Sequence, residues 1–386
     1  MSTIKVNNIV PPNVGEGVSI DGLQMPTAGA FSNRNLLING SMLVAQRSTA
    51  AVSNIEAFNS NPNYDTVDRW GFWASSAAAF TSQQVVDAPP GHYNSLKITS
   101  TSAHVFGVNH GFTVTQRIEA QNLYGTEIGT AAAKTYTFSF WVKSSVTGTF
   151  SFYALNGSFS KSLVSNYTIN VADTWEYKTI SIPAPTDALF AGIENARQLE
   201  VGFSLGAGST FQTSTLGTWE TDSFQIDSTT STKFLETDGA TIQFTGVQLE
   251  VGDKATPFEH ESYGQTLAKC QRYFQKSYNI DVNPGTSTAE AGAITHYGST
   301  DNGGNIVFQT DFRCEMRALP TIIWYNRFDG TQGTIQTARS GSSASPSSFT
   351  YRNSTRGTCG YGVAGASPAS FVSAHVEAHY TASAEL

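Results

Sequence analysis

The sequence predicts an all-β protein: an antiparallel β-sandwich of the jelly-roll type, then one connector helix, then a second, smaller β-sandwich. Composition is the first reason. Charged residues make up only 13% of the 386 residues and aromatic residues 12%, with 34 glycines, which is typical of folded strands and turns. The second reason is that several segments alternate apolar and polar residues with a period of two, without the strand–helix–strand rhythm of a parallel sheet.

Residues 1–30 are expected to form a short N-terminal arm. Pro and Gly punctuate this stretch, and its two apolar triplets, Ile4–Val6 and Val18–Ile20, are too short to bury much within one chain. Terminal segments stay loose unless something ties them down. We therefore expect the arm to anchor the chain by docking on another protein or on copies of itself; a flexible leader is the alternative.

Residues 31–258 are expected to form the larger β-sandwich. In Tyr136–Lys143 and in Leu199–Leu205 every second residue is apolar, the pattern of a strand with one buried face. In Ile242–Val251 the apolar positions change phase at Gly246, which predicts a β-bulge. Many short strands separated by Gly, Ser and Asn turns favour a sandwich or jelly roll.

Residues 259–276 are expected to form the connector helix. Ser262 and Gln265 have the spacing of a capping box. Apolar residues then recur at helical spacing along one face, at Tyr263, Leu267, Cys270 and Phe274. The helix connects the two β-regions; an alternative is that it lines a three-fold axis with two copies of itself.

Residues 277–386 return to strand-like patterns and are expected to form the second β-sandwich. The candidate strands are Asn305–Gln309, Thr321–Tyr325 and Ser370–Glu377.

Charge and cysteine content exclude several classes of function. The net charge is −8, from 30 acidic and 22 basic residues, and no basic stripe of the kind that binds nucleic acid is present. The sequence contains no run of about 18 apolar residues, so it predicts no membrane insertion. The first residues lack the basic and apolar regions of a secretory signal. Three widely spaced cysteines do not form a disulfide framework or a zinc motif.

Several segments resemble parts of one known domain. Its opening is matched by Asn35–Met42, Ala45–Arg47 and Asp68–Trp70, an internal part by Thr130–Lys134 with Phe138–Ser144, and its close by Thr245–Gly252, Ala255–Glu259, Ser262–Gly264 and Cys270–Tyr273. Together they resemble a class of bacteriophage tail-fibre and virion appendage proteins, over residues 33 to about 276. The domain is in turn similar to carbohydrate-binding jelly rolls. The resemblance implies a homotrimer.

Many of those carbohydrate-binding domains hold a structural calcium ion. At the matching positions this chain has Leu43, Thr245 and Gly246, whereas Ca²⁺ needs several oxygen ligands, mostly carboxylates. We therefore expect no metal there and no cofactor.

Candidate site residues are few. His375, Glu377 and His379 fall on one face of a predicted strand, and such side chains bind zinc or iron. However, strand residues i and i+4 lie about 13 Å apart, too far to chelate one ion within a chain; an exposed polar face is the favoured alternative. Trp141 shares its face with polar residues and is a weak candidate for stacking on a sugar ring, or for packing under a loop.

No catalytic residues are predicted. A glycosidase needs two carboxylates about 5–9.5 Å apart across a cleft, and the sequence does not pair its acidic residues, among them Asp65, Asp68, Glu176, Asp222 and Asp238. Nucleophile elbows, phosphate loops and dinucleotide fingerprints are also absent from the sequence.

Three functional hypotheses remain. The first is a tail-fibre-like structural protein of a phage virion, which docks on other virion proteins through residues 1–30 and adheres to a glycan or other receptor on the host surface. The second is a head fibre or capsid-decorating protein of the same build. The third is a free carbohydrate-binding module of a cell. The missing secretory signal argues against the third, because a surface module must be exported, whereas lysis releases a virion made in the cytoplasm.

Overall fold

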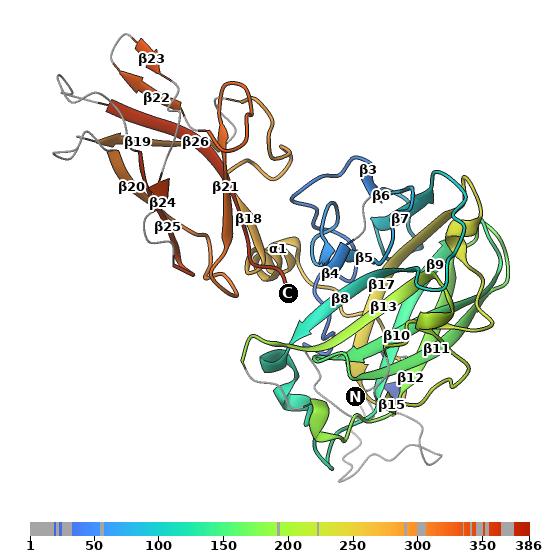
Figure 1. The fold of residues 1–386 in the computed structure, drawn as a ribbon. Coiled ribbons are helices and arrows are strands. Elements are labelled where there is room, and N and C mark those ends of the chain that lie inside the picture. The colour runs from blue at the N-terminus through green and yellow to red at the C-terminus, as the bar shows by residue number, and fades with distance from the viewer. Residues whose placement is uncertain are drawn as a thin grey trace, which may run out of the picture. The chain divides into compact units, whose positions relative to one another are not determined.

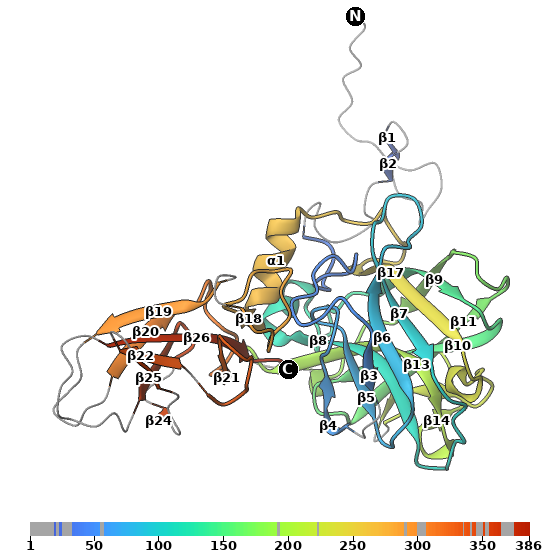
Figure 2. The ribbon, with the colours of Figure 1, turned by 90° about the horizontal axis from the view of Figure 1, so that it is seen from above.

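The computed structural model describes residues 19–20, 23–24, 33–54, 58–190, 194–221, 224–288, 292–298, 306–334, 336–339, 342–344, 350–351, 355–363 and 374–386. These residues fall into two compact units (Figures 1 and 2). The first unit comprises the chain up to Leu43, Ala50–Asp65 and Trp70–Glu261. The second comprises Val44–Thr49, Thr66–Arg69 and Ser262–Leu386.

The first unit is a sandwich of two antiparallel sheets. The seven-stranded sheet has the order β15 (Glu220–Thr221), β11 (Lys161–Ile169), β10 (Gly148–Asn156), β13 (Arg197–Ala207), β8 (Gly111–Glu119), β5 (Gly71–Ala74) and β4 (Phe58–Asn63). The six-stranded sheet has the order β12 (Glu176–Ile182), β9 (Tyr136–Ser144), β17 (Thr241–Val251), β7 (Ser95–Ser100), β6 (Phe80–Val85) and β3 (Val52–Asn54). Figure 2 shows β6, β7 and β17 side by side.

Aromatic rings from the two sheets meet in the core of this sandwich. The ring centroids of Phe138 on β9 and Phe152 on β10 lie 4.4 Å apart. Phe203 on β13 stacks on Phe244 of β17 at 3.9 Å. All four side chains are fully buried, and aromatic pairs add to the free energy of burying their surface. The alternation in Tyr136–Lys143 therefore identified the buried face of β9 correctly.

The predicted bulge is present in β17. The register between β17 and β9 shifts between Thr245 and Gln248, and Gly246 has φ of +59°. A residue with a Cβ is disfavoured in this left-handed region, which explains the glycine at the phase change.

Short elements complete the described part of the first unit. A parallel pair joins β14 to β16, and a two-residue hairpin joins β1 to β2 within the expected arm; the rest of residues 1–30 lies outside the described residues. Their bounds, with those of four 3₁₀ turns, are β1 Ser19–Ile20, β2 Leu23–Gln24, β14 Gln212–Thr213, β16 Asp227–Ser228, and η1 to η4 at Ala120–Thr126, Ala188–Phe190, Ser209–Phe211 and Phe234–Glu236.

The connector helix is shorter than predicted. α1 spans Tyr263–Gln271, and Ser262 caps it in the expected capping box with Gln265. The prediction of a helix from 259 to 276 was wrong at both ends. Ser262 has extended backbone angles, and Phe274–Lys276 form β18, which pairs with β26 (Ala374–Ser383). The ladder hydrogen bonds of that pairing replace further helical turns.

The helix buries only part of the predicted face. Cys270 is buried as predicted, together with Thr266 on the same side of the helix, whereas Tyr263 is 46% exposed. In the part of the chain that the structure describes, no helix is both long and apolar enough to cross a bilayer.

The second unit is built around one long strand. β26 (Ala374–Ser383) pairs with β18, β19 (Ile294–Gly298), β21 (Thr321–Asn326) and β22 (Gln336–Arg339). β23 (Ser342–Ala344) extends this sheet from β22, and a three-stranded sheet contains β20 (Ile306–Asp311), β25 (Thr358–Val363) and β24 (Thr350–Tyr351). Figure 1 shows β26 running past β19 and β22. All these pairings are antiparallel, so the all-β prediction is confirmed.

Two short segments from early in the sequence belong to this second unit, which the sequence did not predict. Gln46 donates from its backbone N to Asp68 Oδ1 at 2.9 Å and from its side chain to the carbonyl of Phe274 at 2.8 Å. Arg47 forms an ion pair with Glu385 at 3.1 Å, and Arg69 forms another with the same carboxylate. Buried charges of this kind are tolerated when they are paired.

Candidate functional site

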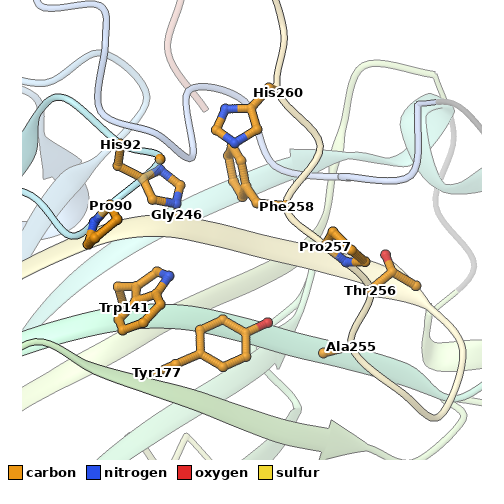
Figure 3. Close-up of a pocket in the computed structure, with 11 residues that line it drawn as sticks. Pro90, His92, Trp141, Tyr177, Gly246, Ala255, Thr256, Pro257, Phe258 and His260 are labelled. Carbon is orange, nitrogen blue, oxygen red and sulfur yellow. The ribbon is translucent and has the colours of Figure 1, made fainter. Parts of the chain in front are cut away.

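A pocket of about 580 Å³ opens on the outer face of the six-stranded sheet of the first unit. Eleven residues line it (Figure 3). They are Pro90, Gly91, His92, Trp141, Tyr177, Gly246, Ala255, Thr256, Pro257, Phe258 and His260. Its size is in the range of small-molecule sites, which are mostly apolar with a few polar groups.

Two aromatic rings form one side of the pocket. Trp141 on β9 and Tyr177 on β12 are direct partners in the strand register, and their ring centroids lie 5.3 Å apart. Both point outward, because the neighbouring Phe140 and Val142 on β9 face the core. Tyr177 is 43% exposed and Trp141 is half-buried. Rings that remain accessible on a sheet face offer a flat apolar surface to a ligand.

Three further rings face this pair. His92 comes from the turn between β6 and β7, and Phe258 and His260 come from the segment after β17. The centroid distances are 5.0 Å for His92 and Phe258, 5.4 Å for His92 and His260, and 4.9 Å for Phe258 and His260. Figure 3 shows the space between these rings and the rings of Trp141 and Tyr177.

Buried side chains of β17 hold the segment after it in place. Glu250 accepts hydrogen bonds from the Thr256 backbone N at 2.8 Å and from its hydroxyl at 2.6 Å. Gln248 accepts one from the Glu259 backbone N at 2.8 Å. Both acceptor side chains are buried. The wall that carries Phe258 is therefore fixed before any ligand binds, which lowers the entropic cost of binding.

His92 is neutral at pH 7. Burial, and then the charge of neighbouring His260, lowers the pKa of His92 to about 4. Its Nδ1 atom is buried and has no hydrogen-bond partner among the described residues, so a proton there would lack an acceptor. A neutral imidazole keeps one N–H donor and one acceptor nitrogen, so Nε2 can form a hydrogen bond with a ligand.

The described lining of the pocket has no carboxylate, ammonium or guanidinium group, because none of these residues is Asp, Glu, Lys or Arg. Burial raises the pKa of the Tyr177 hydroxyl, which keeps it protonated. A lining without a carboxylate pair does not support general acid–base catalysis of glycoside hydrolysis.

Of the ligand-binding and metal candidates from the sequence, the structure places one in this pocket, and Gly246 of the predicted bulge also lines it. Trp141 lines it, whereas Tyr177, His92, Phe258 and His260 were missed. Phe258 lies in the quoted segment Ala255–Glu259, but nothing in the sequence shows that this segment faces Trp141. Tyr177 is next to Trp141 only through strand pairing.

The metal candidates lie elsewhere, on β26. His379 is fully buried, and its ring stacks on Tyr278 at a centroid distance of 3.7 Å. Its Nδ1 and Nε2 lie 3.1 Å from the Ser277 hydroxyl and 3.0 Å from the Thr288 carbonyl. Glu377 is buried and paired with Arg327 at 2.6 Å. The expectation of an exposed polar face was therefore wrong for these two residues.

The remaining candidates do not form a site. The side chain of His375 and all of Asp222 lie outside the described residues. Within the described ranges, no three His, Cys, Asp or Glu side chains are grouped so that they could hold a metal ion. Thr245, at a position matched to calcium ligands in the resemblance, donates its hydroxyl to the Asn94 carbonyl at 2.7 Å.

Comparison with known proteins gives weak likenesses only. No family model and no curated protein matches the sequence. Among solved structures, the enzymatically active domain of tailspike protein 4 of bacteriophage CBA120 matches at 14% identity and a TM-score of 0.28, covering 51% of this chain. The match spans 21% of that tailspike chain.

Two carbohydrate-binding structures match at a similar level. The family 11 carbohydrate-binding module of a cellulosomal cellulase of Clostridium thermocellum has 13% identity and a TM-score of 0.26, covering 55% of this chain and 99% of the module. The xylan-binding domain of Paenibacillus barcinonensis Xyn10C has 11% identity and a TM-score of 0.26, covering 55% and 99%. All these TM-scores are below 0.5, so the fold assignment rests on the strand pairing of this chain itself.

Proposed function

We propose that this chain is a non-enzymatic glycan-binding protein that holds a neutral sugar ring in the pocket beside Trp141 and Tyr177. The observation that carries the proposal is the pairing of two accessible aromatic rings in a pocket without charged lining. The apolar C–H face of a sugar packs on an aromatic face, and a few fixed polar groups then select its hydroxyls. His92 Nε2 and the Tyr177 hydroxyl are such groups.

The biological setting that we propose follows from the sequence resemblance. The chain is a tail-fibre-like component of a phage virion, trimeric, anchored by residues 1–30 and adhering to the host surface through its glycan site. A single pocket of this kind binds weakly, but several sites on one particle raise the overall affinity by about 10²–10⁴. Adhesion of this kind needs no catalytic group.

A glycan array followed by isothermal titration calorimetry tests the binding. The array holds neutral and anionic saccharides, and we expect the neutral ones to bind. Trp141→Ala and Tyr177→Ala should each weaken binding by about tenfold or more, because each removes one ring of the pair. Tyr124→Ala is the control, since Tyr124 is 58% exposed and does not line the pocket. Binding that survives both pocket substitutions would refute the proposal.

Two measurements test the setting. Light scattering at micromolar concentration should give the mass of a trimer, and a monomer would contradict that part of the proposal. Immunogold electron microscopy of intact phage, with an antibody against residues 277–386, should label the tail. Label over the head would instead identify a head fibre or decorating protein, and unlabelled particles would refute a virion role.

A further inference from the structure

A second group of side chains lies on the same sheet face as the pocket, one step along β9. Lys143 follows Trp141 by two residues, so both point to the same face, about 6.6 Å apart along the strand. Lys143 forms an ion pair with Asp87, whose side chain is 42% exposed. Asp87 also accepts hydrogen bonds from Trp175 Nε1 at 3.3 Å and from Gln243 Nε2 at 3.1 Å.

Trp175 lies beside Lys143, just before the start of β12. Glu176 pairs with Val142 in the register of β12 and β9, which brings Trp175 beside Lys143. The Lys143 Nζ lies 5.3 Å from the centre of the Trp175 ring. The pair of Trp141 and Tyr177 is therefore followed on the same face by the pair of Lys143 and Trp175. The distance between them along the strand is comparable with the size of one sugar unit.

The ion pair has hydrogen-bonding capacity left for a ligand. Partial burial raises the pKa of Asp87, but hydrogen bonds from Lys143, Gln243 and Trp175 outweigh it, so the carboxyl stays ionised at neutral pH. A carboxylate offers about four acceptor positions, and an ammonium group three donors. Asp87 uses three acceptor positions in the contacts above, so about one remains for a ligand. The negative charge of Asp87 and the positive charge of Lys143 cancel, so the ion pair has no net charge.

We infer that Asp87, Lys143 and Trp175 form a second sugar subsite, so that the chain recognises a neutral oligosaccharide of at least two units rather than a single terminal sugar. This inference rests on the proposed function of the pocket. One sugar packs beside Trp141 and Tyr177. The next lies beside Trp175, where its hydroxyls donate to Asp87 and accept from Lys143.

If the ion pair of Asp87 and Lys143 had a purely structural role, its effect on binding would depend differently on the length of the ligand. Asp87 begins the turn that carries Pro90, Gly91 and His92 into the pocket. As a brace for that turn, it would affect every ligand of the pocket equally. As part of a second subsite, it affects only ligands long enough to reach it.

Ligand length therefore separates the two roles. The probes are glucose, galactose and mannose, with their β-1,4-linked dimers and tetramers, titrated by calorimetry into the full chain. For the hexose series that binds, we expect the tetramer to bind about tenfold tighter than the monomer, because hydrogen bonds to charged groups add to affinity. Asp87→Asn and Lys143→Gln should abolish this gain, so that each variant binds the tetramer and the monomer with equal affinity.

A matched control is available on β12. Lys178→Gln removes an ion pair with Glu176 of 2.6 Å and should leave the affinity for every probe unchanged. Equal losses for monomer and tetramer in the Asp87 and Lys143 variants would overturn the second subsite and leave the pocket standing. If no hexose or oligomer binds the unaltered chain, and the array is also blank, the proposed function itself fails.

Discussion

His92 packs directly on Gly246. A Cβ built on Gly246 would lie 2.7 Å from Nε2 of the imidazole and 3.1 Å from Cδ1 of Trp141. Gly246 therefore has two roles. It forms the β-bulge of β17, and its missing side chain leaves room for His92, from the turn after β6, to lie close to Trp141 on β9.

Gly246→Ala should therefore weaken sugar binding and destabilise the first unit. The left-handed φ of +59° costs an alanine about 1 kcal/mol, and the clash with His92 adds to it. Gly239→Ala is the matched control, because its φ of +72° is similar but its Cβ would meet open space. We expect thermal unfolding to show a larger loss for Gly246→Ala, and calorimetry to show weaker binding only for this variant. Equal behaviour of the two variants would contradict the contact.

His92 should make the first unit less stable at acidic pH. Its pKa is about 4 in the folded chain, lowered by burial and then by His260, against 6.5 for an unperturbed imidazole. Between these values the unfolded chain binds more protons, so the free energy of unfolding falls as the pH drops from 6.5 towards 4. His92→Gln should flatten that slope in thermal unfolding measured from pH 7 to pH 4. A variant with the full slope of the unaltered chain would refute this role.

Asp68 should have the opposite effect on the second unit. Burial raises the pKa of Asp68 to about 6, although the charge of Arg47 and hydrogen bonds from Gln46 oppose the rise. The folded state then binds a proton at a pH where the unfolded state does not. Lowering the pH from 7 to 5 should therefore stabilise this unit, by about 1.3 kcal/mol.

Hydrogen exchange of β18 and β26 peptides at pH 7 and pH 5, corrected for the intrinsic exchange rate, measures this effect. Asp68→Asn serves as the reference, because it cannot titrate. Protection that is equally pH-dependent in the variant would assign the effect to another group.

His379 should stabilise the second unit without a metal ion. His379→Ala removes the stack on Tyr278 and leaves the Ser277 hydroxyl and the Thr288 carbonyl without their ring partner. We expect a loss of about 2–4 kcal/mol in the free energy of unfolding. A chelator such as EDTA should leave the melting temperature of the unaltered chain unchanged, and a fall would reveal a metal site.

Local patterns in the sequence were enough to predict several strands and the bulge, although the strand predicted at 370–377 continues to Ser383 in β26. The alternation around Phe138 and Phe140 reports which face of β9 is buried, because strand geometry has a fixed period of two. The phase change at Gly246 and the capping box at Ser262 are local in the same way. The end of the helix was not predictable, since Phe274 leaves the helical pattern only by pairing with β26, more than 100 residues later.

The site was harder to predict for the same physical reason. Trp141 stood out because it shares a strand face with polar residues, but its neighbours in the pocket come from β12, from the turn after β6 and from the segment after β17. Register between strands depends on the whole sheet. The sequence likewise did not reveal that the segments containing Gln46 and Asp68 belong to the second unit.

The ion pairs of Glu385 also bear on how the chain is made. Arg47 and Arg69 precede their shared partner by 338 and 316 residues. At about 5–20 residues per second, synthesis of that length takes roughly 15–70 s. The two arginines must therefore wait for this carboxylate until Glu385 has emerged from the ribosome. A chain cut short before Glu385 never supplies it, so these ion pairs distinguish chains that contain the last strand of the second unit from chains that stop before it.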